Sequence, residues 1–198
     1  MQNFNFTRGK IALLVGIIAV AGLGYYYRGF FVAASVNGEF ISRFSVIREL
    51  EKRSGKAALE GLVVENLILA EIEKNGVAVG NEEIDAEVKK LEEQMAATGQ
   101  NLDTLLAQEG STRDDMKKQI SIRKGVEKLL SDKLAVSDTE IDEYIKTNSV
   151  PVPKEGIPEF REQIKGQLRG QKFNTEASAW LEALKSNSSI KYFTSYGN

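Results

Sequence analysis

The sequence predicts a mainly α-helical protein with a small antiparallel β element, preceded by one transmembrane helix. All three prolines lie between residues 148 and 160, and long helices can form elsewhere because proline breaks them. An uncharged, mostly apolar run at residues 11–27 is at the short end of the lengths that span a membrane. An Asn37-Gly38 pair between short apolar segments is typical of a two-residue hairpin turn.

Composition excludes several classes of site. The 198 residues contain no cysteine and no histidine, so disulfides, thiolate or imidazole metal sites and histidine-dependent catalytic triads are impossible. We therefore expect no catalytic residues, no metal and no cofactor. Residues 37–198 carry 23 basic and 28 acidic side chains, and Ser45–Glu143 has no aromatic residue. Without a basic stripe or stacking platform, nucleic acid is not an expected partner.

The amino-terminal residues predict a cytoplasmic tail, 1–10, followed by a transmembrane signal anchor, 11–28. The basic residues Arg8 and Lys10 precede the apolar run, which favours a cytoplasmic amino terminus. The aromatic cluster Tyr25–Tyr27 suits the membrane–water interface on the other side.

A cleaved signal peptide is the alternative for this segment. The Ala19–Ala21 stretch has the small-x-small pattern that signal peptidase prefers. Both interpretations leave residues 29–198 in the periplasm or at the cell exterior. With an uncleaved anchor, the protein crosses the cell membrane once and contacts lipid through residues 11–27.

A helical domain is predicted for residues 32–147. It opens with a hairpin of Val32–Val36 and Phe40–Ile41, and Ser42 caps a helix that runs to about Ser54. The segment 59–72 is apolar around most of its circumference, so we expect a central helix buried on several sides. Asn75-Gly76 is the expected end of this helix.

Two similar segments follow. Residues 77–90 and 134–147 each lead from a short extended piece into a helix with acidic residues in its first turn. Asn81 is the expected cap of the first helix, and Ser137 with Glu140 forms a capping box for the second. The acidic residues suit the positive end of the helix dipole better than they suit a pair of catalytic carboxylates.

The proline-containing connector, residues 148–157, separates this domain from a returning segment, residues 158–193. The returning segment has a helical apolar pattern that ends near Asn187. Ile190–Phe193 has a strand pattern, and we expect it to pair beside the hairpin because an isolated hairpin is marginal in water. The β element would then join the two ends of the domain.

Three segments carry a resemblance to a known family. They are VNGEFISRFSV at 36–46, the region from VAVGNEEIDAEVKK to ISIRK at 77–124, and LAVSDTEIDEYI at 134–145. Together with the segment FREQIKGQLRGQKF that follows the prolines, they resemble the helical chaperone domain of extracytoplasmic folding factors of the SurA, PrsA and PpiD type. The resemblance covers residues 33–147 and 158–193.

The resemblance implies a chaperone that binds unfolded or newly exported polypeptides. In that family a parvulin-type prolyl isomerase domain stands where this chain has VPVPKEG. Such a domain needs about 100 residues, so we expect a holdase without isomerase activity. An interaction or assembly module for one membrane complex is the alternative. A peptidyl-prolyl isomerase is disfavoured.

Candidate client-binding residues follow from the same resemblance, because members of the family cradle clients on the helical domain. Methionine and leucine side chains repack readily around varied partners. The alternative is that these residues form an ordinary core. The candidates are Leu91, Met95, Leu102, Leu106 and Met116.

Overall fold

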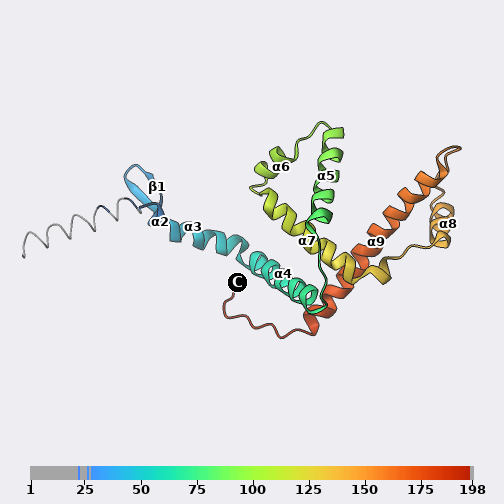
Figure 1. Ribbon diagram of the computed structural model, residues 1–198. Coiled ribbons are helices and arrows are strands. Elements are labelled where there is room, and N and C mark those ends of the chain that lie inside the picture. Colours follow the sequence, from blue (N-terminus) through green and yellow to red (C-terminus); the bar gives the residue numbers. More distant parts are fainter. Residues whose placement is uncertain (1–21, 23–25, 27, 197–198) are drawn as a thin grey trace, which may run out of the picture. The chain divides into compact units, whose positions relative to one another are not determined.

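The computed structural model describes residues 22, 26 and 28–196 (Figure 1). The predicted anchor, residues 11–28, therefore lies, except for three residues, outside the described part of the chain. Within the described part, no helix combines the length and apolarity needed to cross a bilayer. The chain divides into two compact units. The first is Met1–Glu60 with Tyr192–Asn198, and the second is Gly61–Lys191.

The first unit opens with the predicted hairpin. A short helix, α2 (Arg28–Phe31), leads into β1 (Val32–Val36), which pairs antiparallel with β2 (Glu39–Ser42). At the turn, Asn37 and Gly38 have φ values of 52° and 90°, the left-handed conformation that such a turn requires. The expected hairpin is confirmed.

The expected third strand is wrong. Among the described residues the sheet has only β1 and β2, and Ile190–Phe193 is irregular. The tail returns instead to helical residues of the first unit. There the Tyr196 ring lies so close to Gly55 that a Cβ atom would come within 2.7 Å of it. The tail thus packs on a helix surface, where the absent side chain of Gly55 leaves room for the Tyr196 ring. The β element does not join the two ends of the domain.

One helical stretch follows the hairpin without a loop. The Ser42 hydroxyl accepts a hydrogen bond from the Ser45 amide and caps α3 (Arg43–Leu50). A π-helical turn, η1 (Glu51–Gly55), then continues directly into α4 (Lys56–Lys74). The predicted break near Ser54 is therefore absent. α4 ends as expected at Gly76, whose φ of 65° lets the Val77 amide bond back to the Ile72 carbonyl.

The second unit is helical throughout its regular structure. Its elements after α4 are α5 (Asn81–Ala97), α6 (Leu102–Gln108), α7 (Arg113–Leu129), the 3-10 turn η2 (Ser131–Leu134), α8 (Asp138–Thr147) and α9 (Ile157–Ser186). The Ser137 cap of α8 is confirmed, with Glu140 completing the capping box. The cap of α5 is Gly80 rather than Asn81, and the Glu83 carboxylate accepts from the Gly80 amide.

Two apolar clusters hold the second unit together. The first joins α5, α6 and α7 around Ile84, Val88 and Ile120. The second joins the end of α7 and η2 to α9 and α4, and it contains Leu134, the most deeply buried large side chain of the described chain. Its other members are Val126, Leu130, Ile68, Phe173, Ala177 and Trp180.

α4 differs from the expectation of a helix buried on several sides. None of its residues is buried, and Leu62 is 58% exposed. It contacts the rest of the second unit through one side only. There Ile68 meets the second cluster, and the Ile72 side chain lies over Gly125 of α7. The apolar residues around α4 indicated burial on all sides, but the second unit covers only one face of this helix. Leucines on its other face are therefore exposed to solvent.

Candidate functional site

The five predicted client-binding residues come together, but in the first apolar cluster. Leu102 and Leu106 are buried, with 7% and 8% exposure, and Leu91, Met95 and Met116 are half-buried against them. A client could reach the two buried leucines only if α6 moved away from α5 and α7. In this conformation all five side chains stabilise the domain, and their contact with clients stays a prediction.

Ion pairs of one arginine link α6 to α5 and α7. The Arg113 guanidinium at the start of α7 lies 2.5 Å from the Asp103 carboxylate of α6 and 2.8 Å from the Glu92 carboxylate of α5. The hydrogen bond from Arg113 lowers the pKa of Asp103 below its ordinary value. One side chain thus connects all three helices that surround the first cluster.

An apolar groove lies between α4, α7 and α9 of the second unit. Its volume is about 280 Å³, and its floor is shared with the second apolar cluster. Trp180, the only tryptophan of the chain, is half-buried in its wall. The lining residues are Ile68, Gln119, Ile122, Arg123, Val126, Phe173, Ala177, Ser178, Trp180 and Leu181.

The groove wall combines apolar surface with one cationic edge. The Arg123 guanidinium lies over the Phe173 ring, 5.4 Å from its centroid, a geometry in which ring and cation attract each other. The Arg123 Nε also donates to the Glu127 carboxylate at 3.1 Å. The site therefore offers apolar and aromatic contact with few polar groups, which suits a side chain of an unfolded polypeptide rather than a charged small molecule.

Close approach of α7 to α4 forms one side of the groove. Gly125 faces the Ile72 side chain, and a Cβ atom at this glycine would overlap the Ile72 Cδ1 atom and lie 3.1 Å from Cγ1. The missing side chain at position 125 lets the two helices come together. Val126, the next residue, then lies buried at the groove floor.

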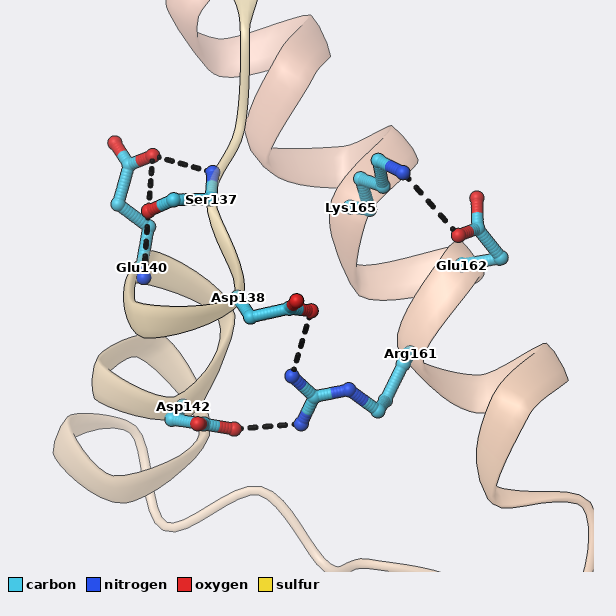
Figure 2. Close-up of polar contacts among 7 residues, drawn as sticks. All are labelled: Ser137, Asp138, Glu140, Asp142, Arg161, Glu162 and Lys165. Carbon is cyan, nitrogen blue, oxygen red and sulfur yellow. Dashed lines mark hydrogen bonds and ion pairs between the residues drawn. The ribbon is translucent and has the colours of Figure 1, made fainter.

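Ion pairs fix α9, which supplies most of the groove wall. Figure 2 shows Arg161 of α9 reaching across to α8, where its guanidinium lies 3.0 Å from Asp138 and 2.5 Å from Asp142. Further along α9, the Lys172 ammonium lies 2.6 Å from the Glu140 carboxylate and donates to the Ala135 carbonyl. The hydrogen bonds from Lys172 and from the Ser137 amide lower the pKa of Glu140 to about 2.

α8 and α9 form a closed helical hairpin at the proline connector. Ile141 of α8 and Ile164 of α9 are both buried, and Gln167 donates to the Tyr144 hydroxyl at 2.8 Å. Gly156, with a φ of 70°, caps the start of α9 after Pro151 and Pro153, and Pro158 lies in the first turn of the helix. The two helix ends are thus held together by contacts of their own.

Sequence reasoning missed the groove. Its aromatic residues, Phe173 and Trp180, are seven positions apart on a predicted helix and so share one face, a signal that the sequence did contain. The partners on α4 and α7 are separated from them by about 50 to 100 residues, and nothing local pairs them. Among the residues that the structure describes, no cluster of acidic side chains could hold a metal ion.

Comparisons with known proteins agree with this fold. No family model matches the chain. Two curated relatives, both named foldase protein PrsA and both from strains of Staphylococcus epidermidis, are 32% identical over 122 residues. The matched region is 56% of this chain, and the chain spans only 37% of the relatives' length.

A solved structure has a similar fold. The crystal structure named peptidylprolyl isomerase (PrsA) from Bacillus cereus matches with a TM-score of 0.50, at 15% identity over 83% of this chain and 95% of that one. At that identity the likeness concerns the fold. Together with the sequence relatives, it supports the resemblance drawn above to folding factors of the PrsA and SurA type. The match is to proteins named PrsA foldase, of which this chain covers a part.

Proposed function

We propose that the protein is a membrane-anchored holdase that binds unfolded or newly exported polypeptides outside the cytoplasm. The groove between α4, α7 and α9 is the observation that carries this proposal. It is open and lined largely by apolar and aromatic side chains. Holding a client requires accessible apolar surface and no covalent chemistry.

The relatives support the general class of function. Their printed names are foldase and peptidylprolyl isomerase, and both describe proteins that act on other polypeptides. A folding factor of this kind needs a client-binding surface, and the groove is a surface of that character. The matched crystal structure carries the name of an enzyme, and the curated relatives named foldase are longer than this chain, so the absence of isomerase activity belongs to the proposal.

Anchoring is proposed from the sequence. The uncharged run at residues 11–27 follows Arg8 and Lys10, which favours an amino terminus in the cytoplasm and residues 29–198 outside it. Fractionation should recover the full-length chain with the membrane, accessible to protease added from outside. A shorter soluble protein beginning near Gly22 would show cleavage after Ala21 instead.

Three features support a holdase without isomerase activity. The connector between α8 and α9 has nine residues, 148–156, whereas a domain needs on the order of 100. The residues on both sides of it already contact one another through Arg161, Gln167 and the buried isoleucines. The histidines that parvulin-type sites use are also missing from this chain.

A charge placed in the groove tests the proposal. Ser178 lines the groove, is exposed, and donates only to the Asn174 carbonyl of its own helix. Ser178→Glu should weaken the binding of an unfolded client about fivefold or more, because burying a carboxylate against apolar client surface costs on the order of 1 kcal/mol or more. The absence of isomerase activity has its own test. The chain should not accelerate cis–trans exchange of an X–Pro peptide, which is slow enough to measure.

The matched control is Thr175→Glu. Thr175 is also exposed on α9 and donates to the Gln171 carbonyl, but it does not line the groove. Binding can be followed through Trp180 emission with clients that lack tryptophan. Equal affinities for the two variants would contradict the groove assignment. Tight binding of one folded partner, with no binding of unfolded chains, would favour the dedicated assembly module.

A further inference from the structure

Exposed apolar side chains are concentrated in the first unit. Of the 17 large apolar residues that stand strongly exposed in the described chain, ten lie between residues 26 and 50. No residue from 29 to 58 is buried. A soluble protein rarely exposes so many large apolar side chains within one short segment, and exposed apolar surface of this kind marks an interaction site.

The hairpin and α3 carry this surface. Phe40 on β2 is 75% exposed and Phe44 at the start of α3 is 65% exposed. On α3, Ile47 lies one turn after Phe44 and Leu50 lies one turn after Ile47, so the three side chains follow one another along the helix. We call Phe40, Phe44, Ile47 and Leu50 the amino-terminal apolar surface.

The charge around this surface differs from the rest of the chain. Residues 28–53, which follow the apolar run, carry five basic and three acidic side chains, whereas residues 54–198 carry 19 basic and 25 acidic ones. Arg43 and Arg48 flank the apolar residues of α3. Anionic lipid headgroups attract basic side chains that lie next to membrane-embedded apolar ones.

The position of this surface in the chain identifies its partner. Only the four residues of α2 separate the uncharged run ending at Tyr27 from β1. Four helical residues rise about 6 Å, so a spanning helix at 11–27 leaves the hairpin at the bilayer surface. There, phenylalanine and aliphatic side chains beside arginines are typical of segments that lie in the interface.

We infer that the amino-terminal apolar surface is embedded in the membrane interface, with Phe40 and Phe44 inserted among lipid headgroups and upper acyl chains. The inference rests on the proposed anchor at residues 11–27. It adds a second lipid contact, formed by folded residues outside the spanning segment. That contact would hold the first unit against the membrane and leave the groove of the second unit for clients.

The chain contains no cysteine, so single-cysteine labelling of the full-length protein needs no background substitutions. The variants Phe40→Cys and Phe44→Cys carry an environment-sensitive fluorophore, and the protein is reconstituted into vesicles of phosphatidylcholine and phosphatidylglycerol. Val152→Cys is the control, because Val152 is also an exposed apolar residue but lies in the connector of the second unit. Gly16→Cys reports separately on the anchor.

Lipids with a spin label near the headgroup should quench the labels at positions 40 and 44 at least twofold more than the label at 152. Equal quenching at all three positions overturns the inference, even where the label at 16 is quenched by deep spin labels and the anchor is thereby supported. The labels at positions 40 and 44 could instead become shielded from water only as the number of protein molecules per vesicle rises, without quenching by the spin-labelled lipids. That result also overturns the inference and indicates a second copy of the chain as the partner. An unquenched label at 16 refutes the anchor, while quenching at 40 and 44 would still support interfacial binding.

Discussion

Leu134→Ala tests whether the second apolar cluster is the cooperative core of the second unit. Leu134 is 2% exposed, and its cluster joins α4, α7, η2 and α9. The substitution removes the outer carbons of a fully buried side chain, in a place where four elements already meet. Such replacements cost about 2–5 kcal/mol, and the upper part of the range applies when the surroundings do not collapse into the cavity.

Urea unfolding followed by Trp180 emission measures this cost, because Trp180 belongs to the same cluster and is the only tryptophan. With a slope of about 2 kcal/mol per molar urea, the midpoint should fall by roughly 1–2.5 M. The full-length chain is used in mild detergent, so that residues 11–27 stay covered.

Leu105→Ala is the matched control. Leu105 on α6 is 37% exposed, so the same substitution should cost less than about 1 kcal/mol, within the usual range for sites near the surface. Equal midpoints for the two variants would refute the reasoning, because they would mean that burial at Leu134 does not contribute to the measured transition.

Two further predictions concern the walls of the groove and its dependence on pH. Gly125→Val should destabilise the second unit by about 1–3 kcal/mol and weaken client binding, because the new side chain overlaps Ile72 and separates α7 from α4. Gly61→Val on α4, where nothing lies near the added carbon, is the control, and equal losses would contradict the close approach at Gly125. Glu140 has a folded pKa of about 2 against an ordinary 4.5, so its contribution to stability is present above about pH 4.5 and is lost as pH falls toward 2. Glu140→Gln should therefore show a smaller fall in urea midpoint between about pH 6 and pH 3 than the unchanged chain, and identical falls would show that the Lys172 pair does not couple folding to protonation.

The predictions that succeeded depend on residues close together in sequence. The Asn37-Gly38 turn, the Ser42 and Ser137 caps and the stop at Gly76 all work through hydrogen bonds that span six residues or fewer. Such bonds are determined by local conformation, so a short stretch of sequence is enough to predict them. The family resemblance succeeded for a related reason, since it rested on the order of these local elements.

Tertiary packing decided which side chains are buried and where the groove lies. The five candidate residues have the periodicity of a helix face, which cannot distinguish a client surface from the contact between α5, α6 and α7 that the structure contains. The apolar pattern of residues 59–72 does not reveal that neighbours cover one side only. The groove requires Ile68, Arg123 and Phe173 to meet, and their meeting depends on how α4, α7 and α9 pack. The sequence by itself thus determined the hairpin turn, several helix caps and the resemblance to known folding factors, while burial and the groove arise from contacts between residues far apart in the chain.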